Sequence, residues 1–112
     1  MNNRFEIARE FAEAIKSDKI VKIILFGSVA RGDDTEDSDI DILIVSDYWE
    51  EIDPLIMDVV GDIILDKQEL ISPHIRPVER FNNTKDYSFL SNVLKEGVIL
   101  VWSRWIYFQS KW

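Results

Sequence analysis

Two short groups of residues in the first half of the chain combine the residue types that bind phosphate and divalent cations. The first is Gly27-Ser28, and the second, after ten intervening residues, is Asp39-Ile40-Asp41. A glycine at a strand end permits a sharp turn, and a serine hydroxyl beside the free N–H groups of a short helical turn forms an anion site. Gly27 and Ser28 are therefore the candidate phosphate-binding residues.

The two aspartates form the complementary half of this candidate site. Residues two apart on a strand project from one face, so Asp39 and Asp41 are expected roughly 7 Å apart at Cα. Two like charges this close are unfavourable unless a cation lies beside them. Mg²⁺ favours a pair of carboxylates together with substrate phosphate oxygens. The spacing therefore predicts a magnesium-bound nucleoside triphosphate, with Asp39 and Asp41 as metal-binding and catalytic residues.

Arg31 follows in the same turn and has two alternative roles. A guanidinium matches a phosphate group with two hydrogen bonds, which favours a contact with the triphosphate. The alternative is a salt bridge with one of the acids of the next loop, Asp33, Asp34 or Glu36. The sequence leaves both roles open.

The elements that must position these residues are predicted from apolar periodicity and from turn residues. Both faces of the strand over 39–45 are apolar beyond Asp41, so we expect this strand to be central and covered on both sides. Pro54 suits a first helical position, and Pro73 marks an edge strand or a bulge. The expected fold is α/β (α+β), a small mixed sheet flanked by helices. The predicted elements are helices over 3–17, 54–66 and 86–96, strands over 20–26, 39–45 and 70–76, a loop over 32–38, and a final strand or helix extension over 98–102.

The composition narrows the classes of partner. The 112 residues include 13 Lys and Arg against 21 Asp and Glu, for a net charge of −8. Because the net charge is negative, direct binding to nucleic acid through electrostatic attraction is not expected. A basic protein partner or a divalent cation suits this negative charge. The absence of cysteine excludes disulfides and thiolate zinc sites, and it fits a cytoplasmic protein. No apolar run approaches the roughly 20 residues of a membrane span, so no membrane association is expected.

The stretch GSVARG followed by SDIDILIV resembles the minimal nucleotidyltransferase family of the DNA polymerase β-like superfamily. The mark of that superfamily is Gly-Ser, ten residues, then Asp-x-Asp. The likeness is strongest over 20–46 and extends more weakly to about residue 101. It implies a polymerase β-like nucleotidyltransferase fold over 1–102 and transfer of AMP from magnesium-bound ATP to a hydroxyl group. It also implies a helical HEPN-type partner, because some such pairs look like toxin–antitoxin systems in which a tyrosine of the toxin receives AMP.

One part of the family pattern is missing from this chain. Proteins that resemble it usually carry a third carboxylate on a later strand, where it binds metal and helps to deprotonate the attacking hydroxyl. The matching strand, LISPHIR, contains His74 but no acid, and a lone histidine is more often structural. Asp62 and Asp66 share one helix face, and either is a candidate ligand if residues 62–66 form a strand instead. The alternative is a domain that binds nucleotide with little turnover.

The size of the chain and its last residues indicate how the acceptor hydroxyl is supplied. The chain is short for an enzyme that holds two substrates, so we expect another protein to present the acceptor hydroxyl. The segment 103–112 is rich in aromatic residues, which concentrate at interfaces. This aromatic C-terminal tail is either a docking or dimerising segment, consistent with a homo-oligomer, or a last element that packs on the chain's own sheet.

Three functions remain on the sequence alone. The leading one is an ATP- and Mg²⁺-dependent nucleotidyltransferase that modifies a partner protein as the antitoxin of a HEPN-type toxin. The second is a non-catalytic module that neutralises a toxin by forming a complex. The third is an enzyme that modifies a small hydroxyl compound such as an aminoglycoside.

Overall fold

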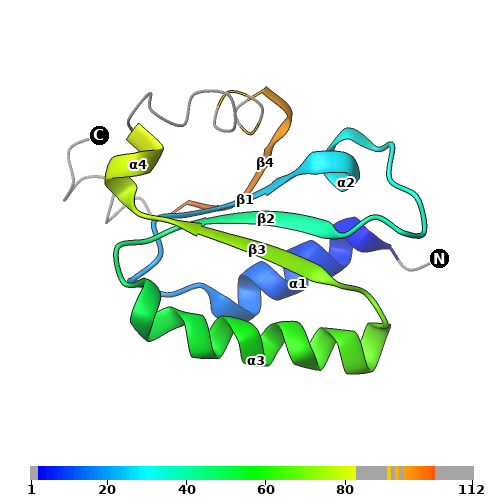
Figure 1. Cartoon of the computed structure of the whole chain (residues 1–112), viewed down its shortest axis with the longest axis horizontal. Coiled ribbons are helices and arrows are strands. Elements are labelled where there is room, and N and C mark those ends of the chain that lie inside the picture. The colour runs from blue at the N-terminus through cyan, green and yellow to red at the C-terminus, as the bar shows by residue number, and fades with distance from the viewer. Residues whose placement is uncertain (1–2, 83–90, 92, 94, 103–112) are drawn as a thin grey trace.

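The computed structural model is organised around a four-stranded mixed sheet with the order β3-β2-β1-β4 (Figure 1). β1 pairs antiparallel with both β2 and β4, and β2 pairs in parallel with β3. The strands are β1 (Lys22–Phe26), β2 (Ile40–Val45), β3 (Ile71–Arg76) and β4 (Val98–Trp102). The structure describes residues 3–82, 91, 93 and 95–102. Three predictions are confirmed. The sheet is mixed, β2 is an internal strand, and β3, which contains Pro73, lies at an edge.

Helices cover the sheet and connect its strands. α1 and α3 lie side by side across one face of the sheet, and α2 joins the end of β1 to the loop before β2 (Figure 1). The helices are α1 (Arg4–Ile15), α2 (Gly27–Arg31), α3 (Trp49–Lys67) and α4 (Val78–Asn82). The described residues of the helix predicted over 86–96 are also helical, and they end before Gly97. Within the described part of the chain, no helix combines the length and apolar character that crossing a membrane requires.

Strand alternation divides the core into two layers, one on each face of the sheet. The side chains of Ile40, Ile42 and Ile44 pack with the buried residues of α1 and α3. The intervening Leu43 and Val45 belong to the opposite layer, where they pack with residues of β1 and of the helical segment before Gly97. All five side chains are completely buried. The first face is therefore occupied by helices, and the second face is the one to which Asp41 belongs by alternation.

α3 begins earlier than the sequence analysis predicts. Its first residue is Trp49, so Pro54 lies inside the helix and not at its start. The buried stripe of α3 runs through Ile52, Ile56 and Val60, and it therefore starts before the proline. Burial of Ile52 offsets the one backbone hydrogen bond that Pro54 removes, and two glutamates in the first turn complement the helix dipole.

Two glycines provide a matched stability test of this packing. A Cβ at Gly97 would lie 2.6 Å from Ile24 Cγ2 and closer still to the carbonyl oxygen of Val93, whereas nothing lies within 4 Å of a Cβ at Gly61 in α3. Gly97→Ala is expected to lower the free energy of unfolding by about 1–3 kcal/mol through overpacking. Gly61→Ala is expected to raise it by about 0.5–1 kcal/mol. Urea denaturation of both variants measures the difference, and equal effects would contradict the packing described.

Candidate active site

The turn after β1 has the geometry that the sequence predicts. Gly27 has φ +78° and opens α2, and Gly32 has φ +82° and ends it, so each lies in the left-handed region that favours glycine. The carbonyl oxygen of Ser28 accepts from the amides of Gly32 at 2.9 Å and Asp33 at 3.1 Å. This turn fixes Ser28 at the start of α2, directly after the end of β1.

The carboxylate of Asp41 lies against the backbone of Gly27. Asp41 pairs in register with Phe26, the last residue of β1. A Cβ on Gly27 would lie 3.2 Å from Asp41 Cγ and closer still to Oδ2. Only a residue without a side chain therefore fits here while Asp41 keeps its position. The turn that carries Ser28 therefore lies against Asp41, whereas the convergence of Ser28 with both aspartates stays a prediction.

Asp39 lies just outside the sheet, which corrects the predicted strand over 39–45. β2 begins at Ile40, whose amide donates to the carbonyl oxygen of Leu70 at 2.9 Å. On the other side β1 ends at Phe26, because the chain turns away there, so a residue before Ile40 has no β1 neighbour to pair with. Asp39 is exposed.

The acids of α3 do not complete the site. Residues 62–66 are helical, so the alternative that they form a strand is wrong. α3 packs on the face of the sheet covered by Ile40, Ile42 and Ile44, whereas Asp41 belongs to the opposite face. Asp62 and Asp66 are exposed on α3 and are separated from Asp41 by the sheet. Among the described residues, no group of three or more His, Cys, Asp or Glu side chains is arranged to hold a metal ion.

Instead of a carboxylate, β3 brings a serine and a histidine beside Asp41. In the parallel register Ser72 lies opposite Asp41, and His74 lies opposite Leu43. His74 Nε2 is 3.6 Å from Asp41 Oδ1 and 3.5 Å from Ser72 Oγ. The ring of Phe26 meets the imidazole edge to face, with centroids 5.2 Å apart. The chain therefore has a polar group, but not an acid, where the resemblance implies a third carboxylate.

The guanidinium of Arg31 forms two ion pairs at the surface. Its Nε lies 3.1 Å from Asp33, one of the partners that the sequence suggested, and its Nη1 lies 2.9 Å from Glu96. These hydrogen bonds raise the pKa of Arg31 above its ordinary value, with Asp33 the first cause. The Arg31 side chain is 44% exposed, and exposed pairs contribute only about 0–1 kcal/mol. A triphosphate can compete for such a side chain, so its phosphate contact stays a prediction.

Arg4 was not identified from the sequence, yet its side chain is buried against the loop before β2 and the segment before β3. The residue is 6% exposed, and hydrogen bonding to Glu69 is the first cause that raises the pKa of the guanidinium. The signal in the sequence was its spacing, because Arg4 precedes the buried Ala8 by four residues and so lies on the apolar stripe of α1. Its four acceptors are the carboxylates of Asp34 and Glu69 and the carbonyl oxygens of Thr35 and Glu36.

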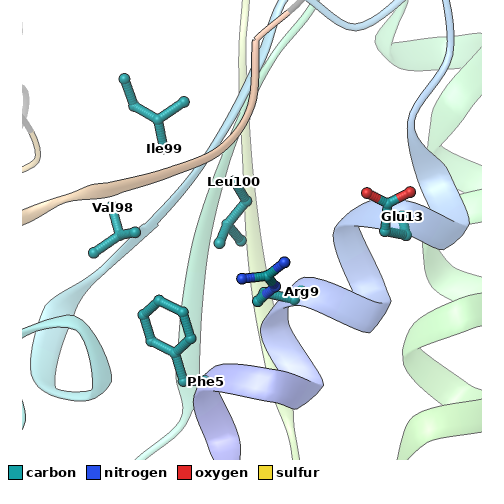
Figure 2. A pocket seen from close by; sticks show the side chains of 6 residues that line it. All are labelled: Phe5, Arg9, Glu13, Val98, Ile99 and Leu100. Carbon is teal, nitrogen blue, oxygen red and sulfur yellow. The ribbon is translucent and has the colours of Figure 1, made fainter.

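A groove between α1 and β4 is separate from this site. Figure 2 shows Phe5, Arg9 and Glu13 of α1 along one side of the groove and β4 along the other. Its volume is about 280 Å³. Val98 and Leu100 of β4, which help to line it, pack against the core layer of α1 and α3, so the groove lies on the face of the sheet away from Asp41. The aromatic tail predicted over 103–112 lies outside the described residues.

Comparison with known proteins assigns the family. The model of the nucleotidyltransferase domain family matches residues 8–103, which is most of the chain. The chain belongs to this nucleotidyltransferase family. A relative from Methanocaldococcus jannaschii named "Putative protein adenylyltransferase MJ0604" is 44% identical over 101 residues, which covers 88% of this chain and 98% of the relative. A second relative from that organism, "Putative protein adenylyltransferase MJ0141", is 36% identical over 98 residues, covering 83% and 94%.

Solved structures confirm the nucleotidyltransferase fold. A crystal structure of a toxin–antitoxin with AMP-PNP matches with a TM-score of 0.58 and 16% identity, covering 93% of this chain and 76% of that chain. A nucleotidyltransferase from Sulfolobus solfataricus matches with a TM-score of 0.50 and 24% identity, covering 93% and 90%. At these identities the likeness establishes the fold alone.

The contact between Gly27 and Asp41 leads to a test with a matched control. Gly27→Ala and Gly32→Ala each place a side chain at positive φ, so both are expected to lose about 1 kcal/mol of stability. Only the Cβ at position 27 meets Asp41, because nothing lies within 4 Å of a Cβ at position 32. Calorimetric titration with AMP-PNP and Mg²⁺ is expected to detect at least about tenfold weaker binding for Gly27→Ala and near-normal binding for Gly32→Ala. Equal affinities would contradict a site at this contact.

Proposed function

We propose that this nucleotidyltransferase transfers AMP from ATP to a hydroxyl group of a partner protein. The observation that carries the proposal is the contact of the Gly27 turn with the Asp41 carboxylate, because it joins a phosphate-binding turn to a cation-binding acid. Two relatives named as adenylyltransferases agree with this chemistry, as does the AMP-PNP bound in one structural neighbour.

The donor set suits Mg²⁺, because Asp39 and Asp41 offer hard oxygen ligands and leave room for phosphate oxygens. When bound, the ion shields the charge of the triphosphate and helps to orient its α-phosphate. Ser28 and the amides at the start of α2 bind the phosphate oxygens. Arg31 leaves its ion pairs with Asp33 and Glu96 and binds the triphosphate instead. Because this site serves ATP, we place the reaction in the cytoplasm.

In the transfer step, the acceptor oxygen forms a bond to the α-phosphorus of ATP. The bond from that phosphorus to the oxygen bridging to the β-phosphorus breaks, and pyrophosphate leaves. The hydroxyl proton passes to solvent water, because β3 lacks the carboxylate that takes it in proteins that this chain resembles. Because Ser72 and His74 stand there instead, we expect transfer to be slow compared with an enzyme that has three acids.

The partner we propose is a HEPN-type toxin, which makes this chain the antitoxin. The support is the fold likeness to two toxin–antitoxin complexes, one of them a mutant of MntA-HpeT matched with a TM-score of 0.57 and 14% identity. A chain with 21 acidic against 13 basic residues also suits docking to a basic protein surface. A separate partner supplies the acceptor hydroxyl that this small domain otherwise has little room to hold.

A second candidate function is neutralisation by complex formation without transfer. The observation that favours it is the composition of β3, which brings Ser72 and His74 and no acid beside Asp41. In that case Asp39 and Asp41 would matter for nucleotide binding but not for control of the toxin.

Substitution of the two aspartates separates the two functions. With ATP labelled at the α-phosphate, Mg²⁺ and a HEPN-type protein as acceptor, Asp39→Asn and Asp41→Asn are each expected to reduce label transfer at least about a hundredfold. Asp37→Asn, an exposed carboxylate of the same loop, is the control and is expected to transfer normally. No transfer by the folded wild-type chain, together with toxin control by both variants, would instead support neutralisation by binding.

An acid introduced on β3 tests whether the missing carboxylate limits the reaction. Ser72 lies opposite Asp41 in register, so Ser72→Asp puts a carboxylate next to the candidate ligands. We expect this variant to bind Mn²⁺ and transfer AMP about tenfold better, whereas the uncharged Ser72→Asn is expected to do neither. Equal behaviour of the two variants would show that an acid at this position does not complete the site.

A further inference from the structure

A buried arginine ties α1 to the two segments that lead into the strands of the candidate site. Arg4 Nη1 donates to Asp34 Oδ2 at 3.0 Å and to the carbonyl oxygen of Thr35, and Nη2 donates to the carbonyl oxygen of Glu36 at 3.0 Å. Nε donates to Glu69, two residues before β3. The carboxylates of Asp34 and Glu69 are only 20% and 10% exposed. One guanidinium therefore fixes the loop before β2 and the entrance to β3 at the same point.

This attachment matters because the sheet holds Asp39 only through the next residue, Ile40, whose amide donates to the carbonyl oxygen of Leu70. Asp41 is paired on both sides, with Phe26 of β1 and Ser72 of β3, whereas Asp39 precedes the first residue of β2. Repulsion between the negative charges of the loop also favours its opening. Residues 33–41 include six carboxylates, which are Asp33, Asp34, Glu36, Asp37, Asp39 and Asp41. Like charges at this density repel one another unless cations lie among them.

The contacts within the loop carry the constraint from Arg4 to Asp39. The amide of Ser38 donates to the carbonyl oxygen of Thr35 at 3.0 Å, and the amide of Thr35 donates to Ser38 Oγ at 2.9 Å. These two bonds close a turn whose first residue is held by Arg4 and whose last residue directly precedes Asp39. Fixing Thr35 therefore limits where Asp39 can lie.

We propose that Arg4 is a positioning residue that holds Asp39 beside Asp41, so that the two carboxylates can bind a divalent cation together. Binding of a cation here rests on the proposed function, whereas the contacts of Arg4 with the loop do not. An arginine suits this role because its planar group carries five N–H donors in fixed directions. A lysine at this position keeps the charge, but its single ammonium cannot reach acceptors on two separate segments in the same way.

The first measurement is Mn²⁺ affinity, followed by electron paramagnetic resonance of the free ion. Arg4→Lys is expected to bind Mn²⁺ at least about tenfold more weakly than the wild-type chain, a loss typical of residues that orient metal ligands. Arg9→Lys, an exposed arginine on the same helix, is the matched control and is expected to bind normally. Equal affinities of Arg4→Lys and wild type would overturn the proposal.

A second set of variants distinguishes positioning from simple neutralisation of buried charge. In Arg4→Met the carboxylates of Asp34 and Glu69 are left without their arginine, so the chain is expected to lose stability. Adding Asp34→Asn and Glu69→Gln removes both charges and is expected to restore much of the thermal stability. If Arg4 positions Asp39, Mn²⁺ affinity stays low in this triple variant. Recovery of the affinity together with the stability would overturn the proposal.

Hydrogen exchange tests the hold on the loop without any metal. The amides of Ser38 and Ile40 are hydrogen-bonded at the end of this loop, so they report whether it opens. We expect both amides to exchange about tenfold faster in Arg4→Lys, with no change in Arg9→Lys. Unchanged exchange would overturn the proposal. If the wild-type chain bound no Mn²⁺, the proposed function would fail, and faster exchange in Arg4→Lys would still support the hold on the loop.

Discussion

The contact between the Asp41 carboxylate and the backbone of Gly27 is the constraint on which the arrangement of the site depends. Asp41 is the residue of β2 that pairs with the last residue of β1, so its side chain stands where the chain must turn. Any side chain at position 27 would occupy the same space. The glycine thus serves two purposes, since it permits the positive φ of the turn and admits the carboxylate. The candidate residues for phosphate and cation binding are brought together by this one close approach.

The division of the sheet into two faces explains both what the site contains and what it lacks. On one face, the isoleucines of β2 are buried under α1 and α3. The candidate site lies on the other face, where β3 brings Ser72 and His74 beside Asp41. An acid on α3 cannot reach Asp41, whatever its spacing, because a buried sheet lies between them. Among the described residues, β3 contributes no carboxylate beside Asp41, and those of α3 lie on the other face of the sheet.

The sequence predicted the parts of the molecule that depend on neighbours in the chain. Apolar runs and glycines located the strands, the turn at Gly27 and the short helix α2, because alternation and positive φ are local properties. The start of α3 was missed because burial of Ile52 outweighs the local signal of Pro54. Contacts between segments far apart in the chain could not be predicted from the sequence. Arg31 meets Glu96 across 65 positions, and Arg4 meets Glu69 across the same separation.

The reach of Arg4 also sets an order of events during synthesis. Its partners lie at positions 34–36 and at position 69, so α1 is made long before the acceptor that completes its contacts. A nascent chain that has not yet released Glu69 from the ribosome lacks one of the two carboxylates, and β3, which follows, has not yet paired with β2. The full set of Arg4 contacts is thus available only after residue 69 has been made. A truncated translation product ending before Glu69 therefore lacks one of the two carboxylates that pair with Arg4.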